Sequence, residues 1–149
     1  MFVQVSAGRL PLFHFMRIFL TVIDSLPPKH FMILCCGVVL VVHDWPTATN
    51  GMLLRGALAV LRPGGAVILH EALLPDAPVP GPATLAPALL SLQMLCHTSR
   101  GGQLTEGAAR ALLAAAGFEA GSVVVERSSA YHHVVVARKP LGQAAKMGV

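Results

Sequence analysis

Two uncharged apolar runs, each followed by a histidine and an acidic residue, constrain the fold of this chain most. Residues 31–42 lead into His43-Asp44, and residues 66–69 lead into His70-Glu71. Short apolar runs that are bounded by polar residues and rich in β-branched side chains are typical of buried strands. We therefore predict a strand at each run, with polar side chains at its carboxyl end.

A helix is predicted between these two strands. Its apolar positions follow a spacing that places them on one side of a helix, namely Leu53, Leu54, Ala57, Leu58 and Leu61. Thr47, Thr49 and Asn50 are candidate N-caps. Residues 62–65, Arg-Pro-Gly-Gly, are predicted to end the helix in a turn. A strand–helix–strand order predicts two parallel strands whose carboxyl ends meet at one sheet edge.

The second half of the chain predicts further helices and a hairpin. Residues 75–87 contain five prolines and are predicted to be a loop before a helix over 88–97. Thr105 is expected to cap a helix over 106–116 that ends at Gly117. Residues 122–127 and 131–138 are predicted to pair as a hairpin, and residues 139–149 to be a disordered tail.

Together these elements predict an α/β fold: a mostly parallel sheet that an antiparallel hairpin closes. The side chains expected in its core come from both helices and strands. They are Leu54, Leu58, Val67, Leu69, Leu113, Phe118 and Val135.

Composition excludes several classes of function. The 11 basic residues exceed the 7 acidic ones, but they are spread along the chain without a basic stripe, so we expect no nucleic-acid binding. The three cysteines predict neither a disulfide framework nor a zinc site, which favours a reducing, cytoplasmic setting. His132 and His133 would point to opposite faces of a strand, so no metal site is expected. The apolar runs 11–23 and 31–42 fall short of the roughly 20 residues that span a membrane.

The candidate catalytic residues lie at the ends of the two predicted strands. His43 and Glu71 would lie on adjacent strands, and a carboxylate on one ring nitrogen of a histidine makes the other nitrogen a better base. The alternative is that His43 ends the strand without a chemical role and that Glu71 is solvated. The spacing alone leaves both interpretations open.

Several segments carry a family resemblance. They are residues 41–46, 61–67, 68–74, 90–95, 112–118 and 131–139. These segments resemble the small-molecule O-methyltransferases that use S-adenosylmethionine, and within that family the acetylserotonin branch of melatonin synthesis. The resemblance covers residues 41–139 and implies the carboxyl-terminal half of a Rossmann-like catalytic domain.

The resemblance also implies roles for individual residues. His43 matches the catalytic base that deprotonates an aromatic hydroxyl, and Glu71 matches the carboxylate that orients it. Asp44 matches an acceptor-binding position. Gln93 and His97 stand where the acetylserotonin branch has substrate-binding Asn and Gln, and Gln103 replaces a second glutamate near the base.

The chain departs from the family upstream of residue 41. Residues 1–40 are divergent, and the glycine-rich turn that holds S-adenosylmethionine is missing, so no cofactor-binding residue is identified. We therefore expect a truncated or alternatively spliced form with an uncovered apolar sheet edge. The alternative to an active methyltransferase is a non-catalytic fragment or pseudoenzyme. Such a chain would pair with itself or with a full-length homologue.

Overall fold

The computed structural model describes residues 17–21, 33–77 and 79–142. Five strands form one sheet in the order β1-β2-β3-β5-β4. Their bounds are Arg17–Thr21 (β1), Ile33–Val39 (β2), Leu61–Ala72 (β3), Val124–Arg127 (β4) and His132–Arg138 (β5). The α-helices are Thr47–Val60 (α1), Pro82–His97 (α2) and Glu106–Ala116 (α3), and two short 3-10 helices are Val42–Asp44 (η1) and Ala120–Ser122 (η2).

The sheet is mixed, which corrects the prediction of a mostly parallel one. Only β2 and β3 run parallel, with Gly37 opposite Ile68, and the connection through α1 makes them so. β4 and β5 form the predicted antiparallel hairpin, and β5 pairs antiparallel with β3. β1, for which the sequence predicted no element, pairs antiparallel with β2 and covers the edge expected to be bare. The fold class is thus α/β, a partial Rossmann-like sheet closed by a hairpin.

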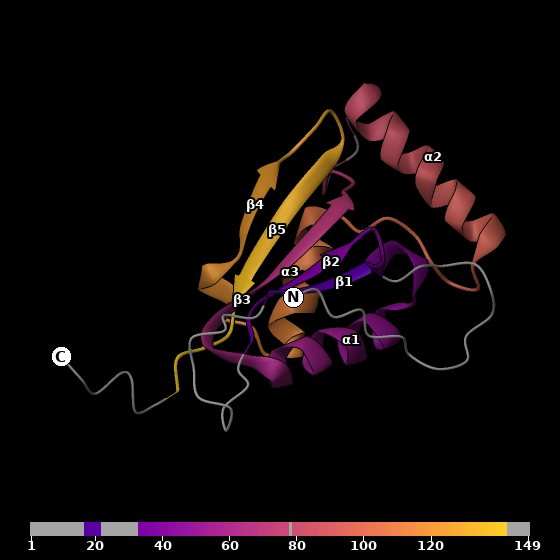
Figure 1. Ribbon diagram of the computed structural model, residues 1–149. Helices are drawn as coiled ribbons and strands as arrows, with labels where there is room; N and C mark the ends of the chain where they lie inside the picture. The colour runs from indigo at the N-terminus through magenta and orange to yellow at the C-terminus, as the bar shows by residue number, and fades with distance from the viewer. Residues whose placement is uncertain (1–16, 22–32, 78, 143–149) are drawn as a thin grey trace.

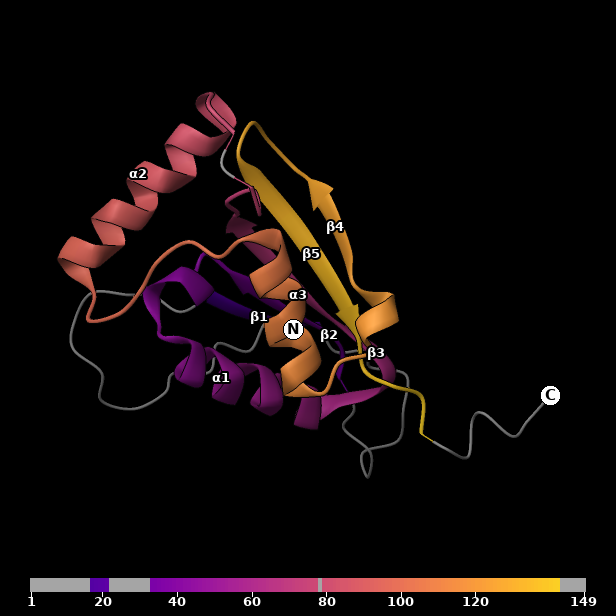
Figure 2. The same cartoon turned by 180° about the vertical axis from the view of Figure 1, so that it is seen from behind.

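Two helices cover one face of the sheet. Figure 2, the view from behind, shows α1 and α3 in front of the strands, and the two helices contact each other. α2 projects away from the sheet at the top of Figure 1. Six of the seven predicted core residues are buried, and Leu58 is partly buried against the same core.

The ends of α3 are as predicted, whereas the start of α1 is not. Thr105 caps α3 by accepting a hydrogen bond from Ala108 N, and Gly117 ends it in the left-handed conformation, as predicted. α1 instead begins after Pro46, and none of its three candidate N-caps accepts a capping bond.

The predicted start of α2 is wrong because prolines were taken to exclude a helix. The helix begins at Pro82 rather than after Pro87, so the predicted loop is six residues too long. Pro82 occupies the first helical turn, where a missing N–H costs nothing and the fixed φ suits a helix. Pro87 is tolerated inside the helix, with its ring buried.

The predicted turn at residues 62–65 lies inside β3. Ile33 pairs with Leu61 and Cys35 with Ala66, so the four residues between Leu61 and Ala66 bulge from the strand, with Gly64 at φ 74°. Lys139, which we predicted to begin a disordered tail, is fixed: its Nζ donates to the carbonyl oxygens of Leu58 and Leu61 at 2.7 and 2.6 Å. Residues 143–149 of that tail, and most of the apolar run 11–23, lie outside the described residues.

Candidate active site

His43 lies just beyond the end of β2, where the chain turns sharply. β2 ends at Val39, and Leu40 adopts φ 51°, a conformation that costs a non-glycine residue energy. Leu40 N donates to the carbonyl oxygen of His70 at 3.0 Å, which keeps the turning chain attached to β3. The next residues form η1, so His43 sits on a 3-10 helix rather than directly on the strand end.

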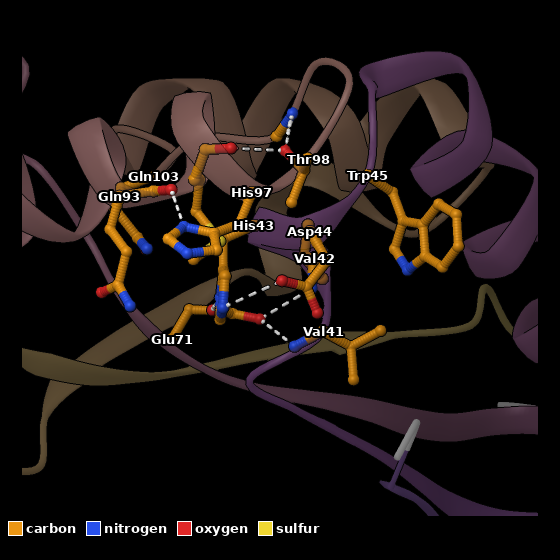
Figure 3. Close-up of polar contacts among 12 residues, drawn as sticks. Val41, Val42, His43, Asp44, Trp45, Glu71, Gln93, His97, Thr98 and Gln103 are labelled. Atoms are coloured by element: carbon orange, nitrogen blue, oxygen red, sulfur yellow. Dashed lines mark hydrogen bonds and ion pairs between the residues drawn. The ribbon is translucent and has the colours of Figure 1, made fainter. Parts of the chain in front are cut away.

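Glu71 anchors this turn from the neighbouring strand. The residue is 3% exposed, and its Oε1 accepts hydrogen bonds from Val41 N and Val42 N, both at 2.8 Å. Its Oε2 lies 2.6 Å from His43 Nδ1. Figure 3 shows these contacts converging on Glu71. The alternative of a solvated Glu71 is therefore wrong.

The contact with Glu71 defines the state of the His43 ring. A carboxylate accepts only, so Nδ1 carries a proton, and in the neutral ring Nε2 keeps its lone pair. Nε2 lies 3.5 Å from Oδ1 of Asp44, whose side chain is 6% exposed. Burial alone would lower the pKa of His43, but the hydrogen bond to Glu71 and the charges of Glu71 and Asp44 outweigh it and raise the pKa above 6.5. His43 is thus a strengthened base, and its neutral ring offers a lone pair on Nε2.

Two further residues hold the backbone of η1. Asn50, on α1 and 1% exposed, donates from Nδ2 to the carbonyl oxygens of Val42 and Trp45 at 2.7 and 3.0 Å. Gly102 N donates to the carbonyl oxygen of His43 at 2.8 Å. Sequence reasoning missed both roles. It assigned Asn50 to capping, although a polar side chain within the apolar helix after His43 was a signal of a buried bond.

The remaining predicted site residues lie on or after α2. Gln93 and His97 are exposed, and His97 Nδ1 bonds to the carbonyl oxygen of Gln93 on its own helix at 2.9 Å. α2 contacts η1, and Figure 3 shows both side chains on the η1 side of that helix. No hydrogen bond in the described structure joins either residue to His43 or Glu71. Gln103 is buried, and its Oε1 has no hydrogen-bond partner among the described residues.

The described residues do not resemble a metal centre or a cofactor cradle. Across ranges 17–21, 33–77 and 79–142, no group of three His, Cys, Asp or Glu residues could hold a metal ion. In this fold class, the turn that binds a nucleotide cofactor needs glycines directly after a strand. β2 is followed instead by Leu40 and Val41, while Gly101 and Gly102 lie in a loop after α2. Within the same ranges, no helix is long and apolar enough to cross a membrane.

A profile of the O-methyltransferase domain matches residues 21–119. This chain belongs to the O-methyltransferase family. The match begins 20 residues before Val41, where the resemblance in the sequence began, and so includes part of the segment that looked divergent.

Similar proteins include animal and plant enzymes. The acetylserotonin O-methyltransferase of Mus musculus is 38% identical over 123 residues, which cover 83% of this chain and 29% of that protein. The Bos taurus enzyme of the same name is 37% identical over 78% of this chain and 31% of its own length. A caffeic acid 3-O-methyltransferase of Zinnia elegans is 35% identical over 53% of this chain and 22% of its own length.

Solved structures show the same fold. Human N-acetylserotonin methyltransferase in complex with S-adenosylmethionine superposes with a TM-score of 0.63 at 28% identity, over 78% of this chain and 31% of that one. An O-methyltransferase family 2 protein from Planctomyces limnophilus, in complex with apigenin, gives 0.62 at 25% identity over 78% and 33%. This chain spans between 22% and 33% of the length of these proteins.

Proposed function

We propose that this chain is the base-bearing part of an S-adenosylmethionine-dependent O-methyltransferase and that it removes the proton from an aromatic hydroxyl. The observation that carries the proposal is the contact between His43 Nδ1 and the buried carboxylate of Glu71. A histidine held in this way offers Nε2 to a substrate. Membership in the O-methyltransferase family supplies the reaction class.

The proton step uses groups that lie within one turn of chain and one neighbouring strand. The hydroxyl of the acceptor would donate its proton to His43 Nε2, and the electron pair of the O–H bond would stay on the oxygen, which becomes a nucleophile. The imidazolium that forms would be stabilised by Glu71 at Nδ1 and by Asp44 near Nε2. Both carboxylates are already in place, so little reorganisation is needed during the reaction.

The acceptor we propose is a small aromatic hydroxyl compound such as N-acetylserotonin, which would place the chain in melatonin synthesis. Relatives named for acetylserotonin and for caffeic acid support an aromatic acceptor. Asp44, Gln93 and His97 would bind it, with α2 approaching η1 to form the wall opposite Glu71. A cytoplasmic setting belongs to the same proposal.

The methyl donor fits the described residues poorly. S-adenosylmethionine is the family's methyl donor and is bound in the human structure. The described part of this chain offers neither a glycine turn after a strand nor a carboxylate beyond such a turn. We therefore assign these residues to the acceptor and the proton only, and we expect the purified chain to bind S-adenosylmethionine weakly.

The test transfers residues 41–139 into the corresponding part of a full-length acetylserotonin O-methyltransferase. The chimaera should methylate N-acetylserotonin, and His43→Ala in it should lower the rate on the order of 100- to 10,000-fold while cofactor affinity, measured by calorimetry, stays the same. His70→Gln, a change in a partly exposed histidine one residue before Glu71 on β3, is the matched control and should retain the rate. Equal rates for the chimaera and its His43→Ala variant would assign the histidine a structural role.

A second candidate function is a non-catalytic chain that associates with a full-length homologue. The observation that favours it is that no glycine turn directly follows a strand among the described residues. The methylation chimaera separates the two. Methylation that depends on His43 favours the base-bearing part, and a chimaera that folds and binds S-adenosylmethionine but does not methylate favours the associating chain.

A further inference from the structure

The turn after α2 lies against the backbone that carries His43. Gly102 N donates to the His43 carbonyl oxygen at 2.8 Å. Gly101 N donates to Thr98 Oγ1 at 2.7 Å, and the Thr98 hydroxyl donates to the carbonyl oxygen of Met94 at 2.8 Å. Residues 98–102 are thus fastened to α2 at one end and to η1 at the other.

Gly101 is the point of closest approach in this turn. A Cβ atom at this position would lie 2.4 Å from the His43 carbonyl oxygen, 2.5 Å from Thr98 Oγ1 and 3.1 Å from the Asp44 carbonyl carbon. Two of these atoms are backbone atoms and cannot rotate away as a flexible side chain can. Gly101 is not among the glycines with positive φ, which are Gly64, Gly81 and Gly117. Close approach of the backbone, and not an unusual conformation, therefore requires a glycine at this position.

We infer that Gly101 is a positioning residue for His43: by admitting the 98–102 turn against η1, it sets where the imidazole meets Glu71. The inference rests on the proposed function and deepens it. The helix that leads into this turn carries Gln93 and His97, the proposed acceptor residues. One rigid connection from α2 through Gly101 then fixes the distance between the acceptor and the base.

The ring of His43 is sensitive to such placement. Its 2.6 Å contact with Glu71 is a charge-assisted hydrogen bond, which weakens steeply with distance and angle. The charged groups that face the ring are Glu71 from β3 and Asp44 from η1, while His132 on β5 interacts with it electrostatically. Glu71 is fixed by two backbone amides, so a displaced η1 changes the contact rather than carrying the carboxylate with it.

The test is a titration of the His43 ring by NMR in the full chain, with Gly101→Ala as the variant and His43→Gln to identify the signal. The added methyl group must move η1 or the turn, so the raised pKa of His43 should fall towards or below 6.5. Two matched glycine variants serve as controls. In Gly102→Ala the new Cβ meets only Ser91 Oγ at 3.2 Å, and in Gly121→Ala it meets nothing within 4 Å. Both should keep the raised pKa.

Two results would overturn the inference: a folded Gly101→Ala chain with the wild-type His43 pKa, or an equal fall in Gly102→Ala. If Gly101→Ala does not fold, Thr98→Val decides, because it removes the hydroxyl that holds Gly101 N and adds no bulk. A partial fall of the His43 pKa in Thr98→Val supports the inference, and an unchanged pKa overturns it. The titration needs neither methyl donor nor acceptor. If the titration gives the expected result but the chimaera does not methylate N-acetylserotonin, only the proposed function is refuted.

Discussion

The two regions that face each other at the candidate site, η1 and α2, are built in opposite ways. η1 is fixed on every side: Glu71 and Asn50 bond to it from β3 and α1, and Gly102 bonds to it from the turn after α2. α2 contains no Asp, Glu, Lys or Arg, and four of its leucines are 57–67% exposed, namely Leu85, Leu89, Leu92 and Leu95. Among the described residues, the side proposed to handle the proton is thus held by hydrogen bonds from three directions, whereas the side proposed to bind the acceptor is exposed.

The two regions differ in the contacts that the described residues supply. η1 is bonded to β3, to α1 and to the turn after α2. A helix with an exposed apolar face has not yet buried the surface that normally stabilises it.

The largest effect is expected at Glu71. Glu71→Leu leaves the backbone amides of Val41 and Val42 and the His43 ring without their acceptor in a buried position, which should cost roughly 3–5 kcal/mol of unfolding free energy. Urea unfolding measures it. The matched control is Glu126→Leu on the exposed strand β4, which should stay within about 0.5 kcal/mol of the wild type. Similar losses in the two variants would mean that η1 is not fixed by Glu71.

Asn50 should matter less than Glu71 because it holds only backbone oxygens. Asn50→Leu removes both hydrogen bonds from the side chain to η1 and should cost about 1–3 kcal/mol. Thr47→Leu, at an exposed position of the same helix, is the control and should leave the urea midpoint almost unchanged. If Asn50→Leu were as stable as the wild type, α1 would contribute packing alone to the site.

The candidate dyad could be predicted from sequence because its geometry follows from local rules. One helix between two strands makes them parallel neighbours, and this rule alone places His43 and Glu71 at one sheet edge. The N-cap of α3 at Thr105 and its end at Gly117 could also be predicted, because each depends on the local sequence. What failed depended on tertiary context. β1 is a strand through its pairing with β2, which its own residues do not indicate, and the start of α2 was obscured by prolines that suit a first helical turn.

The supports of η1 escaped prediction for a related reason. Asn50, Gly101 and Gly102 act through backbone atoms of residues that are distant in sequence or in another element. A single polar residue in a helix, or a pair of glycines in a loop, gives no sign of which carbonyl oxygen it will meet. Knowing that these positions are buried would have pointed to their roles, but the periodicity of the sequence does not show that they are buried.

A smaller effect is expected from pH. The pKa of His43 is raised in the folded chain, so its stabilisation is complete below the unfolded value of 6.5 and is lost as the pH rises through the folded pKa. The stability difference between wild type and His43→Gln should therefore be largest in mild acid and shrink on the alkaline side. Urea midpoints across this range measure it. A difference that does not vary with pH would show that the folded state leaves the His43 pKa unchanged.

His133 is the control, because its contribution to stability should change with pH in the opposite direction. Burial first, and then the charge of Arg127, lower its pKa. The folded chain therefore resists its protonation, and the wild type should lose stability relative to His133→Gln as the pH falls below 6.5. Parallel trends for the two histidines would mean that a global effect of pH, rather than the contact with Glu71, governs His43.

The smallest effect is expected on the open face of α2. Leu89→Gln and Leu92→Gln replace side chains that are 57% and 58% exposed with a good helix former, so each should change the unfolding free energy by less than about 0.5 kcal/mol. Met94→Gln, on the buried side of the same helix at 8% exposure, should cost about 2–5 kcal/mol. Large losses in both leucine variants, together with a melting temperature that rises with protein concentration, would show that another chain covers this face in solution. The contrast would then lie between a region that folds within the chain and one that is completed by association.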